Sequence, residues 1–89
     1  PAADLALCIA VASSLKDEPV GQQVAVMGEV GLGGEIRAIP QADRRVSECV
    51  RLGFTTIVLP RESLRRVKAP EGVTLRGVDT VMQALSVLF

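Results

Sequence analysis

An unbroken apolar run near the start of the chain constrains its fold more than any other feature. Every residue in Leu5–Ala12 is apolar. Asp4 precedes the run and suits the first turn of a helix, and an Asp-Glu-Pro turn follows it, so we expect a helix from residue 5 to about residue 16. A helix that is apolar all round must be covered on every side. The remaining residues are too few to cover it, so we expect cover from residues before Pro1 or from a partner subunit.

Composition excludes several classes of protein. Apolar residues make up 48% of the 89-residue chain, which is too much for a disordered segment. The longest apolar stretch, residues 5–15, is shorter than the roughly 18 residues that a membrane-spanning helix needs. The sequence starts with neither a basic segment nor an export cleavage signal. We therefore expect a cytoplasmic domain that makes no contact with a membrane.

Histidine is absent, which removes the commonest general base and a common zinc ligand. Two cysteines remain, Cys8 and Cys49, and we expect both to be buried free thiols. We expect no metal site and no cofactor site in this chain. The glycines between residues 28 and 34 lack the lysine and the following helix of a phosphate-binding loop, so they predict a hairpin turn.

The rest of the chain alternates strand patterns and helix patterns. Strand segments at 24–30 and 35–39 flank a turn at Gly33-Gly34 and predict a β-hairpin. After the hairpin we expect a helix at 42–52, a strand at 55–59, a short basic helix at 61–67, a strand at 73–78 and a final helix at 81–89. This order predicts one mixed α/β (α+β) domain over residues 1–89, with helices packed on a sheet.

Two of the expected helices carry recognisable end signals. Gly53 follows the helix at 42–52, where a C-terminal glycine commonly ends a helix. Thr80 and Gln83 have the spacing of a capping box at the start of the final helix. The helix at 42–52 also has one apolar stripe, which consists of Ala42, Val46, Cys49 and Val50.

Charge balances over the whole chain but is segregated along it. Residues 1–36 carry a net charge of −4, residues 37–68 one of +5 and residues 69–89 one of −1. A basic patch can bind nucleic-acid phosphates without reading the base sequence. An ordinary solvated surface, or ion pairs with a neighbouring subunit, would also explain the segregation. The candidate DNA-binding residues are Arg44, Arg45, Arg51, Arg61, Arg65 and Arg66.

Three segments, Gly28–Ile39, Leu52–Phe54 and Ile57–Pro60, resemble the proteolytic domain of Lon proteases. The resemblance implies a ribosomal protein S5 domain 2-like α/β fold, N-terminally truncated here, so that this chain is a fragment of a longer protein. It also implies where a catalytic serine and lysine would stand, and those places hold Ala2 and Arg45. Alanine has no nucleophilic atom, and arginine stays protonated and cannot act as a general base. We therefore expect no catalytic residue and no peptidase activity.

Among Lon-like domains, the Pro-Ala-Ala-Asp-Leu-Ala start and the motif at 28–37 are similar to the C-terminal domain of the bacterial RadA (Sms) family. This resemblance implies a non-catalytic assembly and DNA-contact domain that acts in recombinational DNA repair and in the processing of branched DNA intermediates. It implies a DNA-dependent, RecA-like ATPase core and a zinc finger upstream, and hence ATP, Mg and Zn outside this chain. The implied partners are DNA, RecA and further copies of the protein in a ring, expected to be a hexamer.

Two other functions stay open from the sequence. The first is a protein-interaction domain that does not contact DNA. The second is a Lon-type peptidase fragment with displaced catalytic groups, in which Lys16 or Lys68 would be the base. The serines available to it are Ser13, Ser14, Ser47, Ser63 and Ser86.

Overall fold

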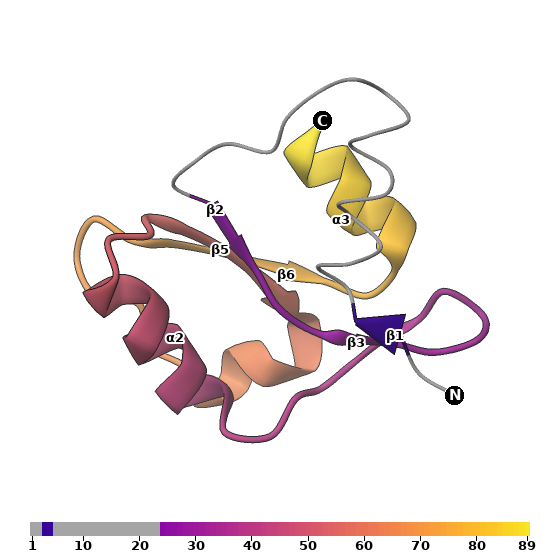
Figure 1. Ribbon diagram of the computed structural model, residues 1–89, viewed down its shortest axis with the longest axis horizontal. Helices are drawn as coiled ribbons and strands as arrows, with labels where there is room; N and C mark the ends of the chain where they lie inside the picture. Colours follow the sequence, from indigo (N-terminus) through magenta and orange to yellow (C-terminus); the bar gives the residue numbers. More distant parts are fainter. Residues whose placement is uncertain (1–2, 5–23) are drawn as a thin grey trace.

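The computed structural model describes residues 3–4 and 24–89, which form two three-stranded sheets with helices packed against them (Figure 1). The antiparallel sheet has the order β1-β3-β4, with β1 at Ala3–Asp4, β3 at Glu29–Val30 and β4 at Ile36–Arg37. The parallel sheet has the order β2-β5-β6, with β2 at Val24–Val26, β5 at Thr56–Pro60 and β6 at Thr74–Val78. The helical elements are α2 at Ala42–Arg51, the 3-10 helix η1 at Arg61–Arg66 and α3 at Val81–Leu88. The prediction of a mixed α/β domain is confirmed.

Strand β5 lies in the centre of the parallel sheet and is buried on both of its faces. Ile57, Val58 and Leu59 each have 0% of their surface exposed. Successive side chains of a strand point to opposite faces, so Ile57 and Leu59 pack in the cluster on the α2 side, and Val58 packs in the cluster on the α3 side. Figure 1 shows these two helices on opposite faces of the sheet. The continuous apolar segment at this strand is typical of a strand covered on both faces.

Helix α2 has the predicted length, apolar stripe and C-terminal glycine. Its stripe faces the sheet, where Val46 is 2% exposed. The helix ends at Arg51, and Gly53 follows the C-cap residue Leu52 with a φ of 98°, a left-handed conformation that glycine adopts without strain. The Gly53 N–H donates to the Val50 carbonyl at 3.0 Å, and the Phe54 N–H donates to the Cys49 carbonyl at 3.1 Å. This pair of bonds is a Schellman motif, which satisfies carbonyls that the helix itself leaves free.

Helix α3 begins with the predicted capping box. The Thr80 hydroxyl accepts a hydrogen bond from the Gln83 N–H at 3.1 Å. The Gln83 side chain accepts one from the Asp79 N–H at 2.6 Å, one residue earlier than in the standard capping box. The fixed helix places Ala84, which is 0% exposed, against the sheet.

The predicted hairpin is present, but the single strand expected at residues 24–30 is wrong. It is divided between the two sheets, because β2 pairs with β5 whereas β3 pairs with β4. The break lies at Met27-Gly28, where the Met27 N–H still donates to the Val58 carbonyl at 2.9 Å. A run of strand-forming residues does not reveal which strand each part of it will pair with. The sequence pattern therefore did not predict that this segment passes from one sheet to the other.

The prediction that Asp4 begins a helix is also wrong. Asp4 lies in β1 and pairs with Glu29 of β3. The helix expected from residue 5 to about residue 16, together with Ala2 and Cys8, lies outside the described residues. No helix in the part of the chain that the structure describes is long and apolar enough to cross a membrane.

Glycine at position 77 allows η1 to lie close to β6. A side-chain Cβ at Gly77 would meet Leu64 and would lie 3.2 Å from the Cα of Arg61. Leu64 is partly buried and packs against the buried cluster on the α2 side of the sheet, so η1 and α2 cover the same face. The close approach at Gly77 therefore sets the distance between η1 and the sheet.

We predict that Gly77→Ala destabilises the protein by about 1–3 kcal/mol, since the added methyl group would force η1 away from the sheet. Urea unfolding followed by circular dichroism measures this change. Thr74→Ala, at an exposed position of the same strand, is the matched control and should change stability much less. An unchanged unfolding midpoint for Gly77→Ala would contradict the close packing of η1 on β6.

The hairpin turn between β3 and β4 carries an ion pair. Arg37 Nη2 lies 3.2 Å from Glu35 Oε1, and both side chains are about half exposed. The pKa of Glu35 lies below its ordinary value of 4.5, because its own backbone N–H and the Arg37 side chain both donate hydrogen bonds to the carboxylate. The ionised carboxylate is thus preferred in the folded hairpin.

A carboxyl group with a lowered pKa in the folded state stabilises the fold above its unfolded pKa. We predict that this contribution of Glu35 is lost as the pH falls below about 4.5 through its lower folded value. The urea midpoint of the Glu35→Gln variant should therefore lie below that of the parent at neutral pH and approach it in acid. Glu71→Gln, in the loop before β6, should show no such convergence. A constant difference between parent and Glu35→Gln at all pH values would refute the prediction.

Candidate nucleic-acid interface

Strand β5 leads directly into η1, which carries three of the candidate arginines. Ser63 is 3% exposed and turns toward the protein interior, whereas Arg61, Arg65 and Arg66 are exposed. The Ile39 N–H donates to the Ser63 hydroxyl at 3.5 Å, which joins η1 to the segment between β4 and α2. The packing of η1 on the sheet therefore turns its arginines outward together.

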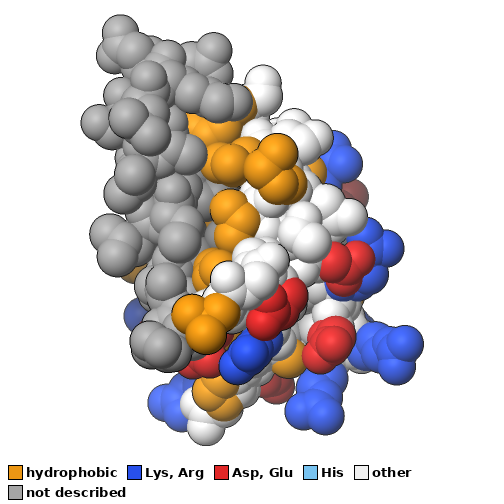
Figure 2. Space-filling view, turned by 90° about the vertical axis from the view of Figure 1, so that its right-hand side faces the viewer, with side chains coloured by type: hydrophobic (Ala, Val, Ile, Leu, Met, Phe, Trp, Pro, Cys, Tyr) orange, Lys and Arg blue, Asp and Glu red, His pale blue; other side chains and the backbone are white. Residues whose placement is uncertain are grey.

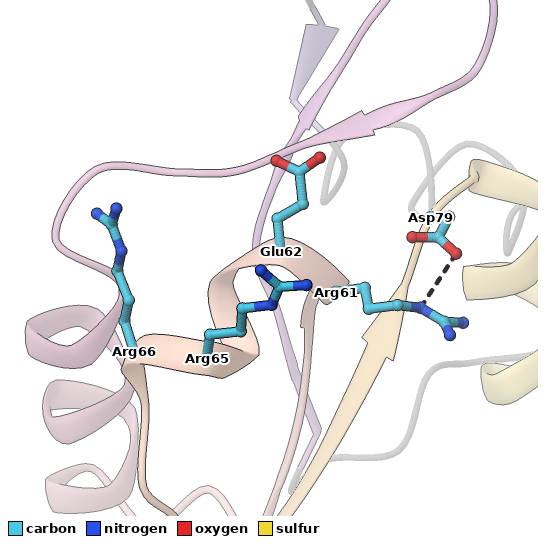
Figure 3. A pocket seen from close by; sticks show the side chains of 5 residues that line it. All are labelled: Arg61, Glu62, Arg65, Arg66 and Asp79. Carbon is cyan, nitrogen blue, oxygen red and sulfur yellow. Dashed lines mark ion pairs between the residues drawn. The ribbon is translucent and has the colours of Figure 1, made fainter.

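The three arginines of η1 line one cavity of about 420 Å³ (Figure 3). Glu62 and Asp79 complete its lining, so every residue around it is charged. Arg61 Nε lies 3.0 Å from Asp79 Oδ2, and the two side chains are 59% and 51% exposed. An ion pair as exposed as this one contributes roughly 0–1 kcal/mol, so a stronger anionic ligand can compete for Arg61. Arg65 and Arg66 form no ion pair within the described residues.

A second cavity of about 410 Å³ shares Glu62 and Arg66 with the first. It lies between η1 and the start of α2. The residues that line only this cavity are apolar or polar in equal number: Ala38, Ile39 and Ala42, and Gln41, Asp43 and Ser63. The two cavities therefore follow η1 side by side, the first wholly charged and the second mixed.

The arginines of α2 lie on other surfaces than those of η1. Each helix residue turns about 100° from the one before, so Arg44 and Arg51 point away from the sheet when Val46 points toward it. Arg51 is also paired with Glu48, with an N–O distance of 2.6 Å. Arg45 lies on the flank of α2 opposite Asp43, and Asp43 lines the cavity next to η1. The structure thus brings together Arg61, Arg65 and Arg66 and separates Arg44, Arg45 and Arg51 from them.

A third cavity, of about 330 Å³, lies on the flank of α2 and contains a serine and a lysine. Ser47 and Lys68 line it with Val46, Val50 and residues 69–70. No hydrogen bond joins Ser47 to Lys68 within the described residues, which is the contact that a serine nucleophile needs from its base. This cavity brings together a serine and a lysine named for the peptidase alternative.

Cys49 is a free thiol, as predicted, but it is half-buried and not fully buried as we expected. Burial, and to a lesser extent the neighbouring Glu48 carboxylate, raises the pKa of its thiol. The thiol is therefore protonated at neutral pH and packs beside the apolar cluster under α2.

Sequence reasoning did not predict that carboxylates lie among the arginines. Glu62 is part of both cavities next to η1, and Asp79 lies at the edge of the first. The sequence Arg-Glu-Ser-Leu-Arg-Arg places Glu62 among the arginines of η1. This position could have indicated that the basic surface also contains a carboxylate. Figure 2 shows side chains of both charges next to one another on one face of the protein, beside a column of hydrophobic ones. The surface is thus mixed in charge, and any anion would be bound by particular guanidinium groups.

Comparison with known proteins gives two findings. Residues 1–87 match the family model described as the Lon protease (S16) C-terminal proteolytic domain. The chain is 43% identical over 89 residues to the DNA repair protein RadA of Streptococcus pyogenes serotype M1, and these residues make up all of the chain and 20% of that protein. It is 47% identical over 85 residues to the DNA repair protein RadA of Escherichia coli K12, and these residues make up 96% of the chain and 18% of that protein. The chain thus spans about a fifth of the length of these curated relatives.

Proposed function

Because this chain belongs to the family of the Lon protease (S16) C-terminal proteolytic domain, we propose that it works as a non-catalytic member of that family. In this proposal it is an assembly and DNA-contact domain of a RadA-type DNA repair protein. The identity of 43–47% to RadA proteins over nearly the whole chain supports the assignment.

The non-catalytic part of the proposal rests on the two places where the Lon resemblance expects a serine and a lysine. Ala2 takes the place of the serine and Arg45 that of the lysine. A methyl group cannot attack a peptide carbonyl, and a guanidinium group stays protonated and cannot take the proton of a nucleophile. Arg45 is exposed on α2, where a permanent positive charge is well solvated.

The DNA-contact part rests on one observation, which is that Arg61, Arg65 and Arg66 line a single cavity. Guanidinium groups bind phosphates through paired, charge-assisted hydrogen bonds. Arg65 and Arg66 have no ion pair within the described residues, so they are available to a phosphate without first breaking one. We propose that the η1 arginines carry most of the DNA contact and that Arg44, Arg45 and Arg51 contribute less.

The remaining parts of the proposal extend the RadA assignment to the whole protein. We propose a cytoplasmic protein that acts in recombinational repair and the processing of branched DNA, together with RecA. An ATPase core that uses ATP and Mg, and a zinc finger, would lie in other parts of that protein. Copies of the protein would assemble into a ring, expected to be a hexamer, with this domain contributing to the contacts.

We predict that the double variant Arg65→Glu, Arg66→Glu of the intact protein binds DNA more weakly than the parent. Each phosphate contact contributes about 0.9 to the slope of log affinity against log salt concentration, so losing two contacts should lower that slope by about 1.8. Fluorescence anisotropy over a salt series measures both quantities.

The matched control is Arg44→Glu, Arg51→Glu on the outward surface of α2, which changes the net charge by the same amount. It should reduce DNA affinity much less than the η1 double variant. Equal effects of the two double variants would mean that general charge, and not the η1 cavity, governs binding. Unchanged DNA binding by the η1 variant would reject the DNA contact and favour a domain that binds only other proteins.

A peptidase remains the second candidate, because Ser47 and Lys68 line one cavity. We predict no hydrolysis of a fluorogenic peptide or of labelled casein by the purified protein. The Ser47→Ala variant is the control, because it separates genuine activity of this chain from a contaminating protease. Turnover that is present in the parent and absent in Ser47→Ala would overturn the non-catalytic proposal.

A further inference from the structure

The turn between β3 and β4 exposes a leucine at its outermost part. The Gly34 N–H donates to the Gly31 carbonyl at 3.1 Å, so Leu32 and the residue after it are the central residues of a closed β-turn. Turn positions of this kind are usually filled by Gly, Pro, Asn, Asp or Ser, and the geometry of the turn gives no reason for a leucine. The Leu32 side chain is 84% exposed. The hairpin thus presents a large apolar side chain to solvent on a hydrogen-bonded support.

A second exposed apolar side chain lies at the same end of the protein. The Val81 N–H donates to the Gly34 carbonyl at 3.0 Å, which joins the start of α3 to the turn. The next residue, Met82, is 75% exposed. Figure 2, which faces this end, shows a column of hydrophobic side chains beside charged ones. Single exposed apolar residues are common on proteins, whereas a group of them indicates a surface that binds another protein.

The cavity on the flank of α2 has the properties of a receiving site for such a side chain. Val46 is 2% exposed and can only form its floor. Val50, Ala69 and Pro70 supply the rest of its apolar lining, with Ser47 and Lys68 as the two polar members. An apolar cavity of about 150 Å³ can hold a benzene ring. At about 330 Å³, this cavity is large enough for a leucine side chain.

We propose that the β3–β4 turn of one copy of the protein docks on the α2 flank of the next copy, with the Leu32 side chain in the cavity at Val50 and Ala69. Figure 1 shows the turn at one end of the longest axis and α2 toward the other, so a copy cannot fill its own cavity. A contact between two different surfaces repeats from copy to copy and closes into a ring where the rotation allows it. This inference rests on the proposed assembly and adds to it the two surfaces that meet.

Charge favours a second copy as the occupant of the cavity. Lys68 lines it, is exposed and forms no ion pair within the described residues. Glu35 directly follows the turn and is 49% exposed while it pairs with Arg37. An ionised carboxylate accepts several hydrogen bonds, so Glu35 can keep Arg37 and also meet Lys68 of the neighbouring copy. A charge pair at the edge of a contact contributes mainly to the choice of partner and orientation.

The turn loses little freedom on docking, because it is already closed by hydrogen bonds within the hairpin. A stable interface buries about 800 Å² on each partner, which is more than the tip of one hairpin supplies. We therefore expect the contact to act within the intact protein, whose other parts supply the remaining interface.

The first test is a photo-crosslink in the intact protein. Leu32 is replaced by the photoreactive amino acid benzoylphenylalanine, and protein labelled with ¹⁵N is mixed with unlabelled protein before assembly. Mass spectrometry then separates crosslinks between copies from those within one copy. We expect crosslinks between copies to join position 32 to residues 46–50 and 68–70. The same amino acid in place of Val87, an exposed position on α3, is the control and should give no crosslink to these residues.

Each other outcome of the crosslink overturns the inference. An assembled protein that crosslinks from position 32 to the turn of another copy, to a different surface or to no other copy would overturn it and leave the proposed assembly standing. If the parent protein is monomeric at every concentration tested, the proposed assembly and this inference both fail.

The second test measures how each side of the contact affects assembly. Leu32→Ala should raise the concentration of half-assembly of the intact protein about tenfold, as expected for a side chain seated in a pocket. Leu32→Met conserves the volume and is the matched control, which should stay near the parent. Ala69→Trp fills the cavity from the other side and should have an effect similar to that of Leu32→Ala. Mass photometry over a dilution series gives these concentrations.

The double variant Leu32→Ala, Ala69→Trp decides whether the two positions meet. Residues in one contact are not additive, so the double variant should lose no more than the weaker of the two single variants. Multiplied effects would mean that the two positions act in separate contacts, and would overturn the inference. Position 32 is so exposed that the urea midpoint of Leu32→Ala should equal that of the parent, which separates weaker assembly from a loss of folding.

Discussion

The complete burial of β5 is the constraint on which the rest of the structure depends. Its central residues have no exposed surface, so both faces of the sheet must be covered, one by α2 and η1 and the other by α3. Because η1 begins directly after β5 and must return the chain to β6, its place is set by the sheet. The exposed side of η1 therefore lies on the α2 side of the sheet, at a height fixed by the close approach at Gly77.

Elements with a clear period or a specific end signal could be predicted from the sequence. The stripe of α2, the glycine at 53 and the Thr80–Gln83 capping box all describe local geometry, and each is confirmed. The resemblance to the Lon and RadA families is confirmed as well. The division of residues 24–30 between two sheets and the strand at Asp4 depend on pairing with distant segments, about which a local pattern contains no information.

The grouping of the arginines also depended on three-dimensional placement. Six arginines within one basic segment suggested one patch, but helix phase separates Arg44, Arg45 and Arg51 from the η1 surface. The η1 surface also contains carboxylates, because Glu62 and Asp79 line the same cavity as the η1 arginines. The sequence could therefore predict which residue types were available, whereas the arrangement of donors and acceptors around each cavity required the fold.

Asp79 connects the first η1 cavity to the rest of the protein. Its N–H donates to Gln83 at the start of α3, its carbonyl accepts a hydrogen bond from the Ile36 N–H of β4 at 2.7 Å, and its carboxylate holds Arg61. Two main-chain bonds thus fix the residue that orients Arg61, whereas Arg65 and Arg66 have no ion pair within the described residues. The first η1 cavity consequently has one arginine that is held by an ion pair and two that are not. In the proposed DNA contact, a phosphate at Arg61 has to compete with Asp79, whereas Arg65 and Arg66 can pair with a phosphate without breaking an ion pair.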